Sequence, residues 1–404
     1  MNVFIIPSWY PSKDNPHTGI FNKEQSVAMA EFNPDSNFAI STWGTHENDL
    51  LILGEDNFKN ILKFLKYPSK KATARKLGGN ITEYYTPAFT WTRKFLQGNM
   101  ENIIKSNEKH LMAFQNEVGK ADIIHAHSAH PGGWVAMLLA KKHAIPYVIT
   151  EHMAPFPFRS FLGKGNTLDK YLARPFQCAA ANVVVSPQQK QNLMKWGIPN
   201  LRYIPNLTDE SFFYPKPKGS SNFVFLTLAV LEDRKGIIYL LKAFKSILTG
   251  YPSARLVIGG DGPQREIYQA LASDLEIAAN VQWLGTLSRQ QAANEMQNCD
   301  AFVLPSFHEN LPLVLLEASA CGKPLIGTYC GGSESIINEK NGLVVEPGNV
   351  DALYGAMEDM YLNHQRYNAE EIRADFISKY SRPVVCKQIM DLYKQVIAQH
   401  KYTL

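Results

Sequence analysis

Residues 301–328 read AFVLPSFHENLPLVLLEASACGKPLIGT and contain one complete unit of a parallel sheet. The apolar run Ala301–Pro305 predicts a buried strand, and the apolar stretch Leu313–Cys321, which follows a polar loop, predicts a helix. A second short apolar run, Pro324–Thr328, predicts the next strand. A strand, a helix and a strand in this order form a βαβ unit, in which the two strands lie parallel.

The same alternation of strand and helix patterns extends along the chain in both directions. In the second half we expect strands at Phe223–Leu228, Ala254–Gly259, Val281–Leu284 and Leu343–Val345, and helices near Ile237–Leu248, Gln264–Ser273, Arg289–Asn298 and Val350–Leu362. In the first half we expect strands at Val3–Pro7, Phe38–Trp43, Ile81–Tyr85, Ile123–His127, Pro146–Thr150, Asn182–Ser186 and Leu201–Pro205, and helices at Lys23–Phe32, Gly133–His143 and Pro187–Trp196. Two such sets predict an α/β protein with two doubly wound halves.

A segment rich in proline, glycine and serine separates the halves at residues 206–222. We therefore expect a first domain of residues 1–208 and a second domain of residues 209–382. Residues 383–404 regain helical periodicity after the second sheet is complete, so we expect a helix that packs on the first domain. Ligands of doubly wound sheets bind outside the carboxyl ends of the strands, so two halves that face each other predict an interdomain cleft.

The composition excludes several other classes of protein. The chain has 404 residues, 45% hydrophobic and 19% charged, which is too long for one small module and too apolar for a disordered chain. A net charge of +4 is too small for general nucleic-acid binding. Five scattered cysteines without a C-x-x-C pair indicate no disulfide framework and no zinc site, and favour a reducing compartment. Without a signal-peptide pattern or an apolar run of ~18 residues, we expect a cytoplasmic protein.

A glycine-rich turn, GGDGP at residues 259–263, follows the strand Ala254–Gly259. Gly260 and Gly262 would let backbone N–H groups and a helix N-terminus approach a phosphate. The turn is not a dinucleotide fingerprint, because the third glycine of G-x-G-x-x-G is replaced by Arg265. The alternative is a tight turn with a purely structural role.

A more specific pattern lies in SFHENLPLVLLEASACGKP, residues 306–324. The helix that begins near Pro312 has free N–H groups that favour an anionic diphosphate. Glu309 lies in the loop before this helix, and Glu317 lies on the helix. Because carboxylates would repel a phosphate, we expect both to accept hydrogen bonds from sugar hydroxyls. The alternative is a solvated loop glutamate and a solvated helix glutamate.

This segment resembles the E-x-x-x-x-x-x-x-E signature of the group 1 retaining glycosyltransferases, a nucleotide-sugar-dependent family related to glycogen synthase. The resemblance covers nearly the whole chain, including PSWYPSKDNPHTGIFNKEQ (7–25), VVVSPQQKQNLMKWGIPNLRYIPN (183–206) and GGSESIINEKNGLVVEPGN (331–349). It implies a GT-B fold of two facing Rossmann-like domains, with the acceptor site in the first and the nucleotide-sugar site in the second. It also implies a reaction without metal or any cofactor besides the nucleotide-sugar donor.

The family roles can be transferred to individual residues of the second domain. Glu309 is similar to the carboxylate that holds hydroxyls of the donor sugar, and Glu317 to the one that holds the nucleotide ribose. Lys235 is similar to the lysine that neutralises the diphosphate, where a positioned cation stabilises the leaving group. Val230 replaces the arginine that the family often has five residues earlier. Arg234 either substitutes for that arginine or is a solvated surface residue.

In the first domain, Gly19 and Ile20 are similar to the glycine loop whose amides approach the diphosphate; the alternative is a bare turn after Asn15–Pro16. His127 matches the family's cleft histidine, which contacts the donor sugar, and His152 in TEHM is a second cleft candidate. Either is alternatively a hydrogen-bonded core histidine. His127 is also part of HAHSAH, residues 125–130, but three histidines without nearby acids or cysteines fit no common catalytic zinc pattern.

A basic segment at residues 57–76 carries seven positive charges and no negative charge. Apolar residues at helical spacing predict an amphipathic helix up to Tyr67 that could lie on an anionic membrane. Its membrane-contact candidates are Lys59, Lys63, Lys66 and Lys70. The alternative is a helix packed on its domain with a solvated lysine face.

We therefore interpret the chain as a retaining glycosyltransferase that moves a hexose-type sugar from a nucleoside diphosphate sugar to an acceptor hydroxyl. The basic segment favours a lipid-linked glycan as acceptor, used in surface polysaccharide synthesis at the cytoplasmic face of a membrane. The alternatives are a soluble sugar or small-molecule acceptor, and a non-catalytic nucleotide-sugar-binding protein. Nucleic acid is not expected as a partner.

Overall fold

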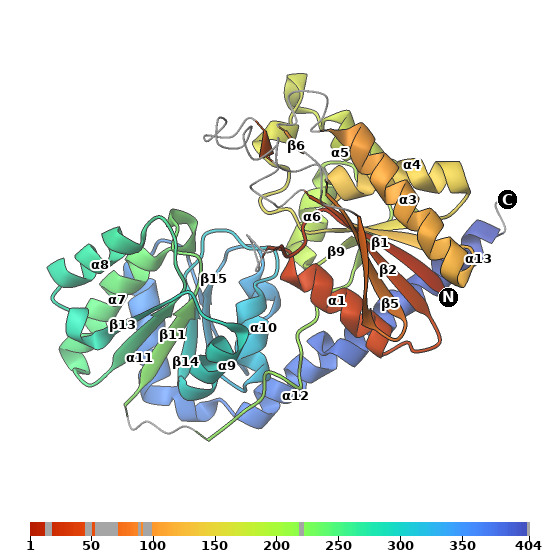
Figure 1. The fold of residues 1–404 in the computed structure, drawn as a ribbon. Coiled ribbons are helices and arrows are strands. Elements are labelled where there is room, and N and C mark those ends of the chain that lie inside the picture. Colours follow the sequence, from red (N-terminus) through yellow and green to blue (C-terminus); the bar gives the residue numbers. More distant parts are fainter. Residues whose placement is uncertain are drawn as a thin grey trace. The chain divides into compact units, whose positions relative to one another are not determined.

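The computed structural model describes residues 1–12, 18–44, 51–52, 72–87, 90–91, 99–217 and 222–401, and it contains two compact units (Figure 1). Unit 1 comprises residues 1–185, 190–204 and the chain from Cys386 onward. Unit 2 comprises residues 186–189 and 205–385. The observed change from unit 1 to unit 2 thus falls at residues 204 and 205, where the sequence analysis placed the boundary at 208 and 209.

Unit 1 contains an eight-stranded sheet in the order β10-β9-β8-β7-β1-β2-β5-β4. Its strands are β1 (Asn2–Pro7), β2 (Asn37–Trp43), β4 (Thr73–Gly78), β5 (Ile81–Thr86), β7 (Ile123–His127), β8 (Tyr147–Glu151), β9 (Ala181–Val184) and β10 (Leu201–Tyr203). All neighbours pair in parallel except β4, which pairs antiparallel with β5 at the edge. Two short strands, β3 (Leu51–Ile52) and β6 (Thr90–Trp91), pair with each other.

Helices cover both faces of this sheet. They are α1 (Ile20–Glu31), α3 (Met100–Val118), α4 (Trp134–His143), α5 (Lys170–Cys178), α6 (Pro187–Lys195) and α13 (Arg382–Lys401). Figure 1 shows α1 on one face and α3 and α4 on the other. Every residue of β1 from Val3 to Pro7 is buried, because a parallel strand covered on both sides exposes neither face.

Unit 2 contains a six-stranded parallel sheet in the order β13-β12-β11-β14-β15-β16. The strands are β11 (Val224–Leu228), β12 (Arg255–Gly259), β13 (Val281–Gly285), β14 (Ala301–Leu304), β15 (Leu325–Thr328) and β16 (Gly342–Val345). The helices are α7 (Ile237–Gly250), α8 (Arg265–Asp274), α9 (Arg289–Asn298), α10 (Leu313–Ala320), α11 (Val350–Asn363) and α12 (Ala369–Tyr380). Helix α7 contacts α8 and α11, while α10 contacts α9 and α12, so two helical layers enclose the sheet (Figure 1).

The α/β fold class predicted from the sequence is confirmed, and each predicted strand is present with ends displaced by at most two residues. The sequence analysis did not predict the edge strand β4 or the helices α3, α5 and α12. Helix α3 was missed because its inward face carries polar side chains, among them Asn107 and His110, which both contact the Ser41 hydroxyl. Strand β4 was missed because nearly all of its residues are exposed.

In each sheet the first strand of the unit lies at a topological switch point. Strand β1 lies between β2 and β7, and β11 lies between β12 and β14, so the connections from each lead to opposite faces. Loops diverge at the carboxyl ends of such strand pairs and leave room for a ligand. Within the described part of the chain, no helix is both long enough and apolar enough to cross a membrane.

Candidate functional site

Unit 2 brings Lys235 and Glu309 together at the switch point of its sheet. Lys235 ends the 3₁₀ turn Asp233–Lys235 that follows β11, and Glu309 lies in the loop after the neighbouring strand β14. The Lys235 Nζ donates to Glu309 Oε1 at 2.6 Å, and each side chain is only 13% exposed. A charge-assisted hydrogen bond of this length is strong, but burying both charges costs much of its energy.

The backbone on either side holds this pair in place. Gly236 has a φ of 67°, and a Cβ there would lie 2.1 Å from the carbonyl oxygen of Pro305. Only glycine fits such a close approach in a left-handed conformation. The Phe307 N–H donates to the Arg234 carbonyl at 2.8 Å, and the Glu309 N–H donates to the Cys330 carbonyl at 2.8 Å. The two loops therefore form one hydrogen-bonded surface that positions the lysine and the carboxylate.

Glu317 lies in the second turn of α10 and is half-buried. The helix begins after Pro312 without a side-chain cap, so its first N–H groups have no capping side chain. Such a helix start favours a nearby anion. A role for Glu317 toward the nucleotide ribose remains a prediction.

The glycine-rich turn after β12 packs tightly against the loop after β11. A Cβ on Gly260 would lie 1.9 Å from the Ala229 carbonyl oxygen, and one on Gly262 would lie 2.5 Å from that of Leu231. The Gly260 N–H already donates to the Gly285 carbonyl at 2.7 Å. Close packing of two loops therefore accounts for both glycines, and their contact with the donor remains a prediction.

The two residues that bear on the missing family arginine are both near the surface. Val230 is 55% exposed, which is high for a large aliphatic side chain. The Arg234 guanidinium is half-exposed and lies 2.6 Å from the Glu232 carboxylate. An exposed ion pair of this kind contributes little stability, so Arg234 can leave Glu232 at small cost. Whether it replaces the missing phosphate contact remains a prediction.

In unit 1, His127 and His152 meet at the carboxyl ends of β7 and β8. The His127 Nδ1 lies 3.0 Å from the His152 Nε2, so one ring donates and the other accepts. Burial lowers the pKa of His152 to about 3 and lowers the pKa of His127 well below its usual value. Both imidazoles are therefore neutral near pH 7. The His127 Nε2 is buried without a hydrogen-bond partner among the described residues, so its hydrogen-bonding capacity is unused there.

The other two histidines of residues 125–130, His125 and His130, contact side chains within unit 1. The His125 Nδ1 bonds to the Tyr393 hydroxyl of α13 at 2.5 Å, and its Nε2 bonds to Thr150 Oγ1 at 2.7 Å. His130 packs edge-on against the Phe161 ring. No group of three or more potential metal ligands converges among the residues that the structure describes.

Glu151 is a site residue that the sequence analysis missed. Its buried carboxylate accepts backbone hydrogen bonds from Ala129, His152 and Met153 at 2.8–2.9 Å, although burial still raises its pKa. These bonds tie the loop after His127 to the loop that carries His152. An acidic residue that ends the apolar strand YVITE was the signal that could have found it.

Gly19 precedes the first turn of α1, which begins at Ile20. Gly19 has a φ of 66°, and a Cβ there would lie 2.3 Å from the Trp9 carbonyl oxygen. The turn therefore requires glycine to pack against the chain after β1, and the proposed amide contact with the diphosphate remains a prediction. The membrane-contact candidates Lys59, Lys63, Lys66 and Lys70 lie outside the described residues.

Two family descriptions match this chain and together span both units. The family of glycosyl transferases group 1 matches residues 209–379, and glycosyltransferase family 4 matches residues 83–212. The chain therefore belongs to the group 1 glycosyltransferases and is a transferase with the GT-B fold.

Relatives and solved structures agree with this assignment. A GDP-mannose-dependent α-(1-6)-phosphatidylinositol monomannoside mannosyltransferase of Mycolicibacterium smegmatis is 30% identical over 184 residues, which cover 41% of this chain and 48% of that protein. A sucrose-phosphate synthase from Thermosynechococcus elongatus has a TM-score of 0.74 at 20% identity, covering 99% of this chain and 100% of that one. The Anabaena protein HepE, in complex with UDP and glucose, has a TM-score of 0.69 at 16% identity, covering 98% and 100%.

Proposed function

We propose that this chain is a retaining glycosyltransferase that transfers a hexose-type sugar from a nucleoside diphosphate sugar to an acceptor hydroxyl. The observation that carries the proposal is the Lys235–Glu309 pair at the carboxyl edge of the unit 2 sheet. A diphosphate that binds Lys235 would take the place of the Glu309 carboxylate as the anionic partner of this lysine. The released Glu309 carboxylate then accepts hydrogen bonds from hydroxyls of the donor sugar.

The chemical step needs charge stabilisation at the leaving group. As the bond from the anomeric carbon to the phosphate oxygen breaks, negative charge grows on the diphosphate, and Lys235 faces that charge. A preorganised cation lowers the barrier because it needs no reorganisation during the reaction. The acceptor oxygen bonds to the anomeric carbon on the face that the diphosphate leaves, and the departing phosphate takes the acceptor proton, so the configuration is retained without a protein nucleophile or general base. No metal or further cofactor is required for this proposal.

The buried histidines of unit 1 suit a neutral ligand. With its Nδ1 engaged by His152, His127 has its Nε2 left for a hydroxyl of the sugar undergoing transfer. A neutral imidazole can accept or donate such a bond, whereas an imidazolium can only donate. Glu151 supports this arrangement through the backbone of the two histidine loops.

We propose a lipid-linked glycan as the acceptor, used in surface polysaccharide synthesis. Two observations support this choice. The relative from Mycolicibacterium smegmatis is described as acting on a phosphatidylinositol mannoside. The basic segment 57–76 carries seven positive charges, and the five besides Arg75 and Lys76, which form ion pairs on β4, would favour an anionic membrane surface. The enzyme would then work as a peripheral protein at the cytoplasmic face of the membrane.

The direct test combines donor binding with product analysis. A panel of UDP, GDP, ADP and TDP, followed by their sugar conjugates, should contain at least one nucleotide that raises the melting temperature, because a ligand of the folded state alone stabilises it. The anomeric configuration of the product, measured by NMR, should match that of the donor. A product of inverted configuration, or no stabilisation by any nucleotide, would contradict the proposal.

A further inference from the structure

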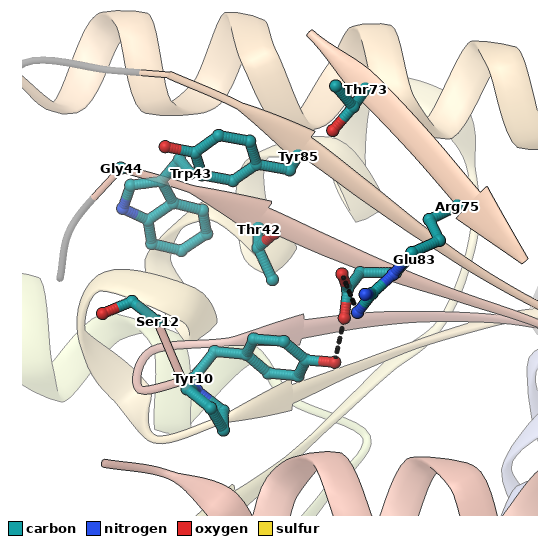
Figure 2. A pocket seen from close by; sticks show the side chains of 10 residues that line it. Tyr10, Ser12, Thr42, Trp43, Gly44, Thr73, Arg75, Glu83 and Tyr85 are labelled. Atoms are coloured by element: carbon teal, nitrogen blue, oxygen red, sulfur yellow. Dashed lines mark hydrogen bonds and ion pairs between the residues drawn. The ribbon is translucent and has the colours of Figure 1, made fainter. Parts of the chain in front are cut away.

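A second site lies in unit 1, at the carboxyl ends of β1, β2 and β5 and the start of β4. It is a pocket of about 430 Å³, a size typical of small-ligand sites. The chain after β1 forms one wall through Tyr10, β2 contributes Trp43, and β5 and β4 contribute Glu83, Tyr85 and Arg75 (Figure 2). The sequence analysis assigned no sugar-binding role to these side chains, although Arg75 is one of the seven charges of the basic segment 57–76.

A carboxylate and a guanidinium lie together on one side of this pocket (Figure 2). Glu83 and Arg75 are directly opposite each other on β5 and β4, and the guanidinium donates to Glu83 Oε1 at 3.1 Å. The Tyr10 hydroxyl donates to Glu83 Oε2 at 2.5 Å from the other side (Figure 2). Burial and the neighbouring carboxylate raise the pKa of Tyr10, so its hydroxyl remains a donor. Among the described residues, each carboxylate oxygen accepts one bond, which leaves it capacity for another.

Three aromatic side chains line the pocket beside this polar pair. Tyr10, Trp43 and Tyr85 all line the pocket; the first two are held rigidly with 7% and 3% of their surface exposed, so each presents only a small area to the pocket. Rigid aromatic faces bind flat apolar surfaces at low entropic cost. Glu83 and Arg75 carry opposite charges 3.1 Å apart, so the pair has no net charge. An anionic ligand would meet the Glu83 carboxylate, and a purely apolar ligand would bury the remaining acceptor capacity of that carboxylate without a donor.

A pyranose ring satisfies both demands, because it has an apolar face of C–H groups and a rim of hydroxyls. We propose that this pocket binds a neutral pyranose of the acceptor, with Glu83 and Arg75 holding its hydroxyls and the aromatic side chains contacting its C–H face. This inference rests on the proposed function, which supplies the acceptor role.

The position in the sheet supports that role. Strand β1 pairs with β7 so that Pro7 lies opposite His127, and the Ser8 N–H donates to the His127 carbonyl at 3.0 Å. The chain then continues directly into Tyr10 and the pocket wall. The pocket and the available His127 Nε2 therefore lie at the same edge of one sheet.

The opposite face of the same strands offers a matched control. There the Tyr84 hydroxyl donates to Glu117 at 3.1 Å, and Lys76 lies 3.6 Å from that carboxylate. Tyr84 and Lys76 are the chain neighbours of Glu83 and Arg75. The control arrangement thus repeats a tyrosine, a carboxylate and a cation, but it lies outside the pocket.

The experiment measures binding of methyl glycosides to the full chain by saturation-transfer NMR. The probes are the methyl pyranosides of glucose, mannose, galactose and N-acetylglucosamine, with glucuronate and glucose 6-phosphate as anionic comparators. We expect at least one neutral probe to bind at millimolar concentration. Glu83→Gln should weaken it about tenfold or more, because a hydrogen bond to a charged group is lost. Arg75→Met, at an exposed position that tolerates substitution, should also weaken it, whereas Glu117→Gln and Lys76→Gln should not.

The outcomes separate this inference from the proposed function. Three outcomes would overturn the pocket assignment alone. The wild type and Glu83→Gln could bind the neutral probes equally, or the chain could prefer the anionic probes. The third outcome is that no neutral probe binds while a nucleotide raises the melting temperature. If no nucleotide stabilises the chain but neutral pyranosides bind in a Glu83-dependent manner, the pocket is supported and the proposed transfer reaction fails.

Discussion

Lys235→Met removes the charge that faces Glu309 while keeping an unbranched side chain. Two unit charges 2.6 Å apart attract by about 6 kcal/mol at an effective dielectric constant of about 20. Most of this attraction offsets the cost of desolvating two side chains that are each 13% exposed. The variant leaves the Glu309 carboxylate nearly buried without its cation. We therefore expect the free energy of unfolding of unit 2 to fall by about 3 kcal/mol.

Urea unfolding of the full chain provides the assay, with a second lysine of unit 2 as control. Lys379 Nζ lies 2.6 Å from Asp375 Oδ1, the same distance, but these side chains are 50% and 34% exposed. Lys379→Met should cost about 0.5 kcal/mol or less, because exposed pairs are screened by water. Adding Glu309→Gln to Lys235→Met should recover most of the lost stability, since no buried charge is then unpaired.

Equal losses for the two lysine variants would refute the reasoning, because burial would then play no part. The same variant also tests the mechanism. Loss of a positioned cation at the leaving group should lower kcat/KM by about 30- to 1,000-fold, or about 2–4 kcal/mol. Transfer that persists at the wild-type rate would show that Lys235 does not stabilise the diphosphate.

Four further predictions test other parts of the site. Glu309→Gln should depress turnover while nucleoside diphosphate binding, measured by calorimetry, is kept or strengthened, whereas Glu317→Gln should weaken nucleotide binding. Gly236→Ala should lower the unfolding free energy by at least about 1 kcal/mol, because a Cβ would clash with the Pro305 carbonyl, while Gly250→Ala, where the space is open, should be neutral or stabilising. Burial lowers the pKa of His125 and His152 to about 3, so below about pH 6.5 the unfolded chain binds more protons than the folded chain. The free energy of unfolding should therefore fall on acidification by up to about 1.4 kcal/mol per pH unit for each histidine. The raised pKa of Glu151 acts in the opposite sense, and urea unfolding measured from pH 7.5 to pH 5 gives the net slope. Replacing Lys59, Lys63, Lys66 and Lys70 with glutamine should abolish co-sedimentation with anionic vesicles, since each charge contributes about 1 kcal/mol near such a surface; a wild-type chain that does not sediment even at low salt would exclude the membrane-bound acceptor.

The parts of the fold that the sequence predicted are those in which burial and pattern coincide. Strands such as β7, IIHAH, are buried on both faces, so their apolar runs identify them directly. Strand β4, TARKLG, is exposed and polar, and it forms because β5 offers an unpaired edge, which no local pattern reveals. The pocket that contains Arg75 and Glu83 could not be predicted for the same reason.

The candidate site residues were predicted from motifs, but the contacts they make depend on strand order. Lys235 and Glu309 are 74 residues apart, and they meet because β14 adds beside β11 rather than beside β13. Sequence spacing does not specify that order. The roles transferred from the family assigned the lysine to a diphosphate and the glutamate to a sugar, without indicating that each neutralises the other when no donor is bound.

That mutual neutralisation explains how the site can hold a nearly buried cation at all. A lysine positioned for a diphosphate would be left without a counter-charge in the unliganded protein, and an unpaired buried charge is strongly destabilising. Glu309 supplies the missing charge at 2.6 Å, and it lies on the loop where sugar hydroxyls can later replace the ammonium group as its donors. If the proposed roles hold, each residue has a partner in both states, so binding of the donor exchanges hydrogen bonds rather than creating or abandoning charges. The Glu309 carboxylate and the diphosphate would thus compete for Lys235. Because Glu309 must release Lys235 before the diphosphate can bind it, removing the charge of Glu309 should strengthen nucleotide binding. The same change should remove the hydrogen bonds from Glu309 to the sugar.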